Sequence, residues 1–205
     1  MMSRKEKELP LNVEWEVEVR DKNGKLLERK RGQSKSLLAN FLRMLYGLFA
    51  GLSGTGYITI KDTSGVGRSY PSLYGTGWPI ARVVAPVNDD THGILVGSGD
   101  APVDPEQYAL ASKIAHGTGS GQLVYNAVTH EAPVVSANVT TYRITRTFTN
   151  NSGASITVKE IGIAIADNIG GTLYYFLIVR DVLPSPSSVP NGATFTCRYT
   201  FKVTA

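Results

Sequence analysis

The chain has 205 residues, which is enough for one large domain or for one domain with a small appendage. Hydrophobic residues make up 42% and charged residues 19%, so the composition is that of a globular chain rather than a disordered one. The single cysteine, Cys197, excludes a secreted scaffold held by internal disulfides. The charged residues 1–8 are not followed by an apolar run, so we expect no signal peptide and synthesis in a host cytoplasm.

The net charge of +4 lies entirely at the front of the chain. Residues 1–45 hold 11 Lys and Arg against 7 Asp and Glu, whereas residues 46–205 hold 10 of each. A dense basic run of this kind is usually a solvated face, and its functional alternative is contact with nucleic acid or an acidic subunit surface. The candidate contacts with an anionic partner are Arg29, Lys30, Arg31 and Lys35.

The first predicted element is a β-hairpin. Residues alternate strictly from Val13 to Val19, with valines and a tryptophan on one face and glutamates on the other, as in a half-buried strand. Asn23 and Gly24 tolerate positive φ, and the chain returns through residues 26–31. The pattern predicts two antiparallel strands.

A helix is predicted next, with Ser34 or Ser36 as its cap. Apolar residues recur at spacings of three and four, and the stripe that we expect at an assembly interface is Leu37, Phe41, Leu45 and Leu48. The alternative is that this stripe packs on the core of its own chain. The apolar run is shorter than the ~20 residues of a membrane span and is interrupted by Asn40 and Arg43, so we expect no membrane span.

Residues 53–81 are rich in Gly, Ser and Tyr and are predicted to form a linker or long loop. Flat rings with polar edges can stack on sugars or dock on protein, although tyrosines in loops more often cover the edge of a core. The candidate ligand-binding aromatics are Tyr57, Tyr70, Tyr74 and Trp78.

Short strands separated by turn signals follow, and they indicate an antiparallel β-sandwich or jelly roll. The run from Leu173 to Val179 is apolar on both faces, so we expect it to be a central strand. The fold class predicted is mainly β, with an N-terminal β-hairpin and one α-helix. The predicted units are 1–52, a docking element; 53–81, the linker; and 82–205, the sandwich.

Residues with recognisable chemistry are few. Neither glycine-rich stretch, 51–56 or 117–121, has the spacing of a phosphate-binding loop. Only His92 stands beside carboxylates, and no second ligand cluster supports a metal there. Asp104 precedes a proline, which favours a turn over a catalytic carboxylate pair with Glu106. We expect no enzyme activity, no catalytic residue, no metal and no cofactor.

Three stretches stand out as phrases of strands and turns: Val96–Leu110, Arg146–Gly162, and Arg180–Leu183 followed by Val189–Phe195. They resemble structural proteins of tailed bacteriophages and related archaeal viruses. The resemblance covers about residues 93–205 and consists of strand-and-turn phrases without a catalytic residue. It implies a virion location, with the role of capsid, decoration, connector or tail component left open.

The expected function is therefore that of a virion structural protein that assembles with copies of itself and with other virion proteins. The alternative is a receptor- or carbohydrate-binding module of a fibre or cell surface, which would use the aromatic residues of the 53–81 stretch.

Overall fold

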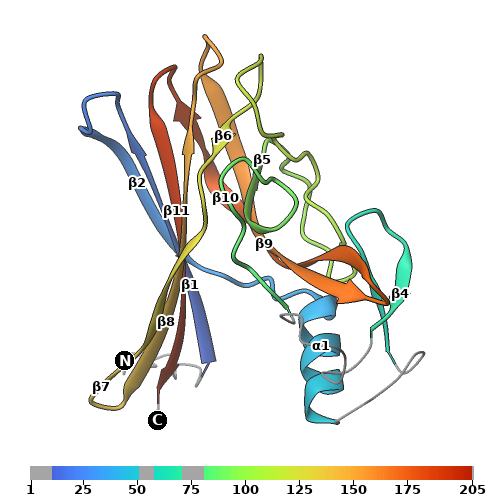
Figure 1. Ribbon diagram of the computed structural model, residues 1–205. Coiled ribbons are helices and arrows are strands. Elements are labelled where there is room, and N and C mark those ends of the chain that lie inside the picture. The colour runs from blue at the N-terminus through green and yellow to red at the C-terminus, as the bar shows by residue number, and fades with distance from the viewer. Residues whose placement is uncertain (1–10, 51–57, 71–80, 205) are drawn as a thin grey trace.

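The computed structural model describes residues 11–50, 58–70 and 81–204 (Figure 1). It confirms the expected fold class: a mainly β protein, with antiparallel sheets packed together and one helix in the described ranges. The elements are β1 (Leu11–Arg20), β2 (Leu26–Gln33), α1 (Ala39–Phe49), β3 (Thr59–Lys61), β4 (Gly67–Ser69), β5 (Gly93–Gly97), β6 (Val124–Tyr125), β7 (Thr129–Ser136), β8 (Val139–Thr149), β9 (Ile156–Ile169), β10 (Thr172–Val189) and β11 (Thr194–Thr204).

The large sheet has the strand order β2-β1-β11-β8-β6, and β7 pairs with β8 as well. The N-terminal hairpin is confirmed, and its first strand pairs with β11 in a register that sets Leu11 opposite Val203 and Arg20 opposite Thr194. The residues 1–52 therefore supply an interior strand to the same sheet as the C-terminal strand.

The small sheet has the order β10-β9-β5. The run from Leu173 to Val179 was expected to be a central strand, but it belongs to β10, and the middle strand is β9. The outer edge of β10 is covered instead by the segment before α1: the Leu38 N–H donates to the Ile178 carbonyl at 2.9 Å, and the Arg180 N–H donates to that of Ser36 at 3.3 Å. These bonds satisfy backbone groups on the outer edge of β10, whose side chains from Phe176 to Val179 are buried.

Because of the same pairing, the helix begins later in the chain than the sequence predicts. Neither Ser34 nor Ser36 caps it, because Ser36 and Leu38 are held along β10 and α1 begins only at Ala39. The side chain of Asn40, in the first turn, donates to the carbonyls of Lys61 and Leu177 at 2.9 and 3.2 Å. The helix is thus tied to both neighbouring sheets.

The core lies between the large and small sheets. Its centre is aromatic: Phe148 packs edge-on against Tyr125, with ring centroids 4.7 Å apart, and near Phe195 at 6.1 Å. The side chain of Arg146 crosses this layer fully buried and donates to the backbone carbonyls of Asn126, His92, Ile94, Pro86 and Asp89. A buried guanidinium that is satisfied in this way fixes the long loops around β5.

A second buried charge holds the loop that follows β5. Arg180 and Glu160 are fully buried and paired at 2.7 Å between Nε and Oε2. The Glu160 carboxylate also accepts the N–H groups of Gly99, Ala111 and Ser112. The loop backbone therefore satisfies the charge that burial would otherwise penalise.

Three local features complete the fold. The chain turns at Ala137, which has a φ of 51°, between β7 and β8. Residues 82–87 make a bridge from Arg82 to Ala166. The 53–81 stretch, which was expected to be a linker or long loop, contains a small sheet of β3 and β4 in its described part.

Candidate functional site

The large sheet extends well beyond the small one at the end where β1 begins and β11 ends (Figure 1). We call this end the β extension; it consists of β7 and the adjoining ends of β8, β11 and β1. Every residue of β7 is exposed. The β extension has no second layer of strands against it in the described part of the chain (Figure 1).

The strand register determines which side chains share the inner face of the β extension. Leu11 pairs with Val203, Val203 with Thr140, and Thr140 with Val135, so these four lie in one row across the strands. The next row contains Tyr142 and Phe201, whose ring centroids are 6.0 Å apart. This inner face continues the apolar core layer to the edge of the molecule, where Val135 is 72% exposed.

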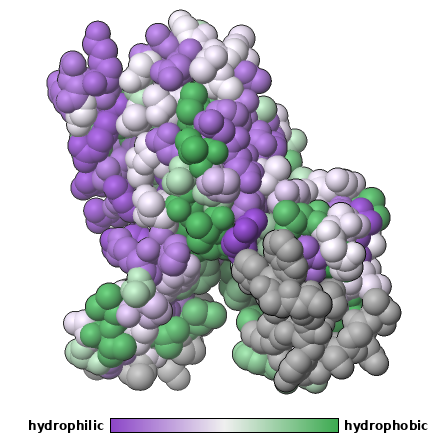
Figure 2. Space-filling model, in the orientation of Figure 1, coloured by the Kyte–Doolittle hydropathy of each residue, from purple (hydrophilic) through white to green (hydrophobic). Residues whose placement is uncertain are grey.

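Figure 2 shows apolar side chains on the lobe formed by the β extension. The described helix has an apolar surface of its own. Leu42, Tyr46 and Phe49, at spacings of four and three, are exposed, with Phe49 at 81%. We call these three residues the helix stripe.

The residues that were predicted to form an assembly interface differ from the three residues of the helix stripe, and those that the structure describes are partly buried. Leu37 and Phe41 pack against the core of their own chain, and Leu45 is half-buried. The side chain of Leu48 lies outside the described part. The helix is apolar on more than one face, and that pattern is the signal that could have indicated the helix stripe.

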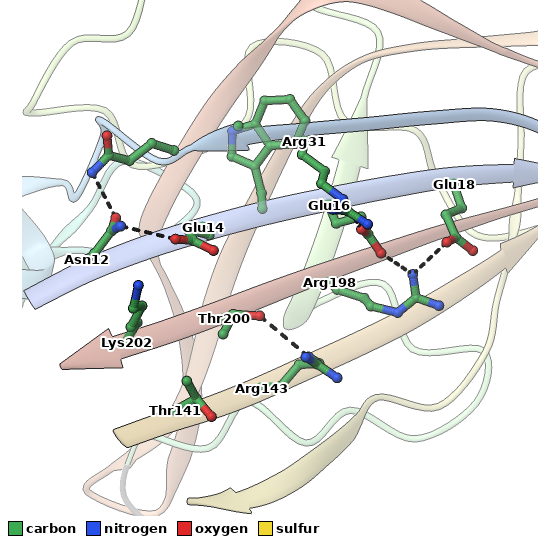
Figure 3. Close-up of a pocket in the computed structure, with 13 residues that line it drawn as sticks. Asn12, Glu14, Glu16, Glu18, Arg31, Thr141, Arg143, Arg198, Thr200 and Lys202 are labelled. Atoms are coloured by element: carbon green, nitrogen blue, oxygen red, sulfur yellow. Dashed lines mark hydrogen bonds and ion pairs between the residues drawn. The ribbon is translucent and has the colours of Figure 1, made fainter. Parts of the chain in front are cut away.

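The outer face of the large sheet forms a polar trough of about 850 Å³ (Figure 3). Glutamates of β1 lie along it, between arginines of the two flanking strands. Arg198 donates to Glu16 at 2.8 Å and lies 3.4 Å from Glu18, and Arg31 on β2 pairs with Glu16 at 2.5 Å. The trough is thus a ladder of cross-strand ion pairs with both charges present.

Glu18 is the most enclosed carboxylate of this ladder. Burial opposes its ionisation, but the hydrogen bond from Arg29 and the charges of Arg198 and Arg29 outweigh that effect, so the pKa of Glu18 is lowered. Its carboxylate therefore stays ionised at neutral pH and holds the arginines in place.

These contacts locate the basic residues that were predicted to meet an anionic partner. Arg29 pairs with Glu18, Arg31 with Glu16, and Lys30 with Glu28 at 2.7 Å. Lys35 is exposed. Three of the four cations thus have carboxylate partners within the chain. These pairs are consistent with a solvated sheet face, which was the alternative to contact with an anionic partner.

The predicted ligand-binding aromatics are not assembled into a site in the described ranges. Tyr70 is buried, and its ring packs edge-on against Phe176 at 5.9 Å. Tyr57, Tyr74 and Trp78 lie outside the described residues. Tyr70 therefore covers the core, which was the alternative considered for it.

The candidate carboxylates have structural partners. Asp104 accepts the N–H of Glu106 at 2.8 Å in a turn, and Glu106 forms a bidentate pair with Arg43 of α1. Within residues 11–50, 58–70 and 81–204, no group of three or more His, Cys, Asp or Glu side chains could hold a metal ion. No helix of these ranges is long and apolar enough to cross a membrane.

No protein-family model, curated protein or solved structure matches this chain.

Proposed function

We propose that this chain is a structural protein that builds a particle by associating with copies of itself, as a component of a virion. The observation that carries the proposal is the β extension, whose inner face is apolar and has no layer against it in the described chain. An antiparallel sheet ordinarily buries its apolar face and leaves only the polar face in water. The described part of the chain supplies nothing that covers Val135 and Val203, and a neighbouring subunit would cover them.

The rest of the described chain supports assembly rather than chemistry. The buried charges Arg146, Arg180 and Glu160 are satisfied by backbone groups, by Gln107 and by each other, and the outer trough contains cross-strand ion pairs. These groups fix loops and stiffen the sheet. A stiff platform with one uncovered apolar end suits a repeated contact between rigid subunits.

The virion location rests on the resemblance of residues 96–110, 146–162, 180–183 and 189–195 to structural proteins of tailed bacteriophages and related archaeal viruses. These stretches form parts of β5, β8, β9, β10 and β11 and the loops between them. These stretches lie outside the β extension, which is therefore free to contact neighbouring subunits.

The size of the purified protein tests the proposal. Light scattering over a wide range of concentration, with negative-stain imaging, should find a uniform oligomer of closed symmetry or a regular filament. Mass spectrometry of purified virus particles encoding the chain should find it in stoichiometric amount. A protein that stays monomeric at all concentrations, or that is absent from the particles, contradicts the proposal.

A further inference from the structure

The polar trough on the outer face of the large sheet has two parts that differ in how their charges are arranged. In one part the charges are neighbours across strands, since Glu16 lies opposite both Arg31 and Arg198 in the register and pairs with each of them. These side chains are occupied with one another and form a solvated ladder. The other part lies nearer the start of β1 and contains Glu14.

The row of Glu14 separates a carboxylate from a guanidinium. The register places Thr200 of β11 between Glu14 of β1 and Arg143 of β8 (Figure 3). Two strand spacings of about 4.8 Å each therefore separate the backbones that carry the two charges. The Arg143 Nε–H reaches the Thr200 hydroxyl at 3.5 Å, which is a long hydrogen bond. The short threonine thus forms a floor between two longer side chains of opposite charge.

The side chains on both sides of this floor are held in place by their neighbours. On one side, Gln33 donates to Asn12 at 2.8 Å, and Asn12 donates to Glu14 at 3.2 Å. On the other side, Arg143 pairs with Glu131 at 3.2 Å. Side chains that are already restrained lose less conformational entropy when a ligand binds to them.

The charges that line the trough select the chemistry of a ligand. Both signs are present: Glu14, Glu16 and Glu18 against Arg31, Arg143, Arg198 and Lys202. A strongly acidic polymer would meet the glutamates and a strongly basic one the arginines, so neither complements the whole surface. A hydroxyl group donates to a carboxylate and accepts from a guanidinium. A neutral ligand with many hydroxyl groups therefore complements both sides.

We infer that this part of the trough binds a neutral carbohydrate, with one sugar ring over Thr200 between the carboxylate of Glu14 and the guanidinium of Arg143. The trough volume of about 850 Å³ leaves room for more than one ring. Trp15, the aromatic residue of the lining, is 5% exposed, so hydrogen bonds rather than ring stacking recognise the sugar. The site is distinct from the aromatic residues predicted for sugar binding, and it goes beyond the proposed assembly function.

Affinity electrophoresis in gels that contain a soluble polysaccharide tests the inference. The probes are dextran, mannan, galactan and xylan, which are neutral, and alginate, which is acidic. At least one neutral polysaccharide should retard the unmodified chain. The apparent dissociation constant should change less than about twofold when the salt concentration is raised, because a neutral ligand has no charge for salt to screen.

Three variants test the two sides and the floor. Arg143→Ala and Glu14→Ala should each weaken retardation at least about tenfold in dissociation constant, as for the loss of a hydrogen bond to a charged group. Thr200→Arg should abolish retardation while both sides remain, because the longer side chain fills the space above the floor. Glu14 and Arg143 are exposed, so the first two variants should keep the melting temperature of the unmodified chain.

The matched control is Arg43→Ala. Arg43 is 37% exposed and pairs with Glu106, much as Arg143 is 45% exposed and pairs with Glu131, but it lies on α1 outside the trough. This variant should be retarded like the unmodified chain. Equal retardation of Arg143→Ala and Arg43→Ala, retardation by alginate alone, or no retardation by any of the four neutral polysaccharides overturns the inference. None of these results bears on self-assembly, which is measured separately.

Discussion

At the scale of single residues, Gly32 shows how a side chain on one strand determines the residue on the next. Trp15 and Gly32 are cross-strand partners in β1 and β2, and a Cβ atom on Gly32 would lie 2.3 Å from Cζ2 of the Trp15 ring. The indole is 5% exposed, so it has little room to move away. The edge strand therefore has glycine where the buried ring crosses it.

We expect Gly32→Ala to lower the free energy of unfolding by about 1–3 kcal/mol, the usual cost of overpacking. Urea denaturation measures the effect. In a Trp15→Leu background the smaller side chain relieves the overlap, so the alanine should cost less there. An equal cost in both backgrounds would show that the ring is not the cause.

A second residue-scale effect concerns pH. Burial lowers the pKa of His92, and the charges of Arg82 and Arg146 act in the same direction, whereas the Asp89 carboxylate and the Val84 carbonyl oppose it. The folded protein thus favours the neutral imidazole. A lowered pKa contributes stability that is present above the unfolded value of about 6.5 and is lost as the pH falls through the folded value.

The free energy of unfolding should therefore decrease on acidification below pH 6.5 more steeply in the unmodified chain than in His92→Gln. Denaturant titrations of both proteins across this range measure the difference. Other titrating groups are common to the two proteins and cancel in it. Parallel pH profiles would mean that His92 does not couple protonation to folding.

At the scale of elements, α1 and the residue that precedes it carry one leucine in the core and another on the surface. Leu38 is fully buried beside β10, whereas Leu42 is exposed in the helix stripe. Leu38→Ala should cost about 2–5 kcal/mol of stability, as for a core leucine, and Leu42→Ala should change it by less than about 0.5 kcal/mol. Thermal and urea unfolding of the isolated monomer compare the two. Similar costs would place both residues in the intramolecular core.

At the scale of the whole molecule, the N-terminal strands β1 and β2 belong to the large sheet. β1 pairs with β11 and covers Phe195, Cys197 and Tyr199, all of which are fully buried. Removal of residues 1–52 deletes this strand and the cover of β10. We expect residues 53–205 to lose cooperative thermal unfolding and to aggregate. A truncated chain that melts cooperatively as a soluble monomer would restore the interpretation of 1–52 as a separate docking element.

Much of the fold followed from local sequence pattern. Strict alternation in residues 13–19 and 195–203 predicts half-buried strands, and both occur in the large sheet. The period of the helix and the Asn23-Gly24 turn were also readable. These features depend on neighbours one to four positions away, which is the range over which backbone geometry relates sequence to structure.

The strand order and the site depend instead on contacts between distant segments. The apolar run in β10 lies at an edge of its sheet, where residues 36–38 bond to its backbone, and no local pattern distinguishes this from a central strand. Likewise, the basic residues of β2 acquire their roles from glutamates of β1 and from the register between the strands. Composition shows the charges but not their partners.

The sequence by itself determined that the chain is a β-rich globular protein with a hairpin, a helix and few chemically reactive clusters. The tertiary structure alone decided which apolar residues stay uncovered. Val135 and Val203 have the same side chain as the valines of the core, and only the length by which the large sheet exceeds the small one leaves them exposed. Burial is a property of the assembled layers, since a strand residue is covered only if another layer reaches it.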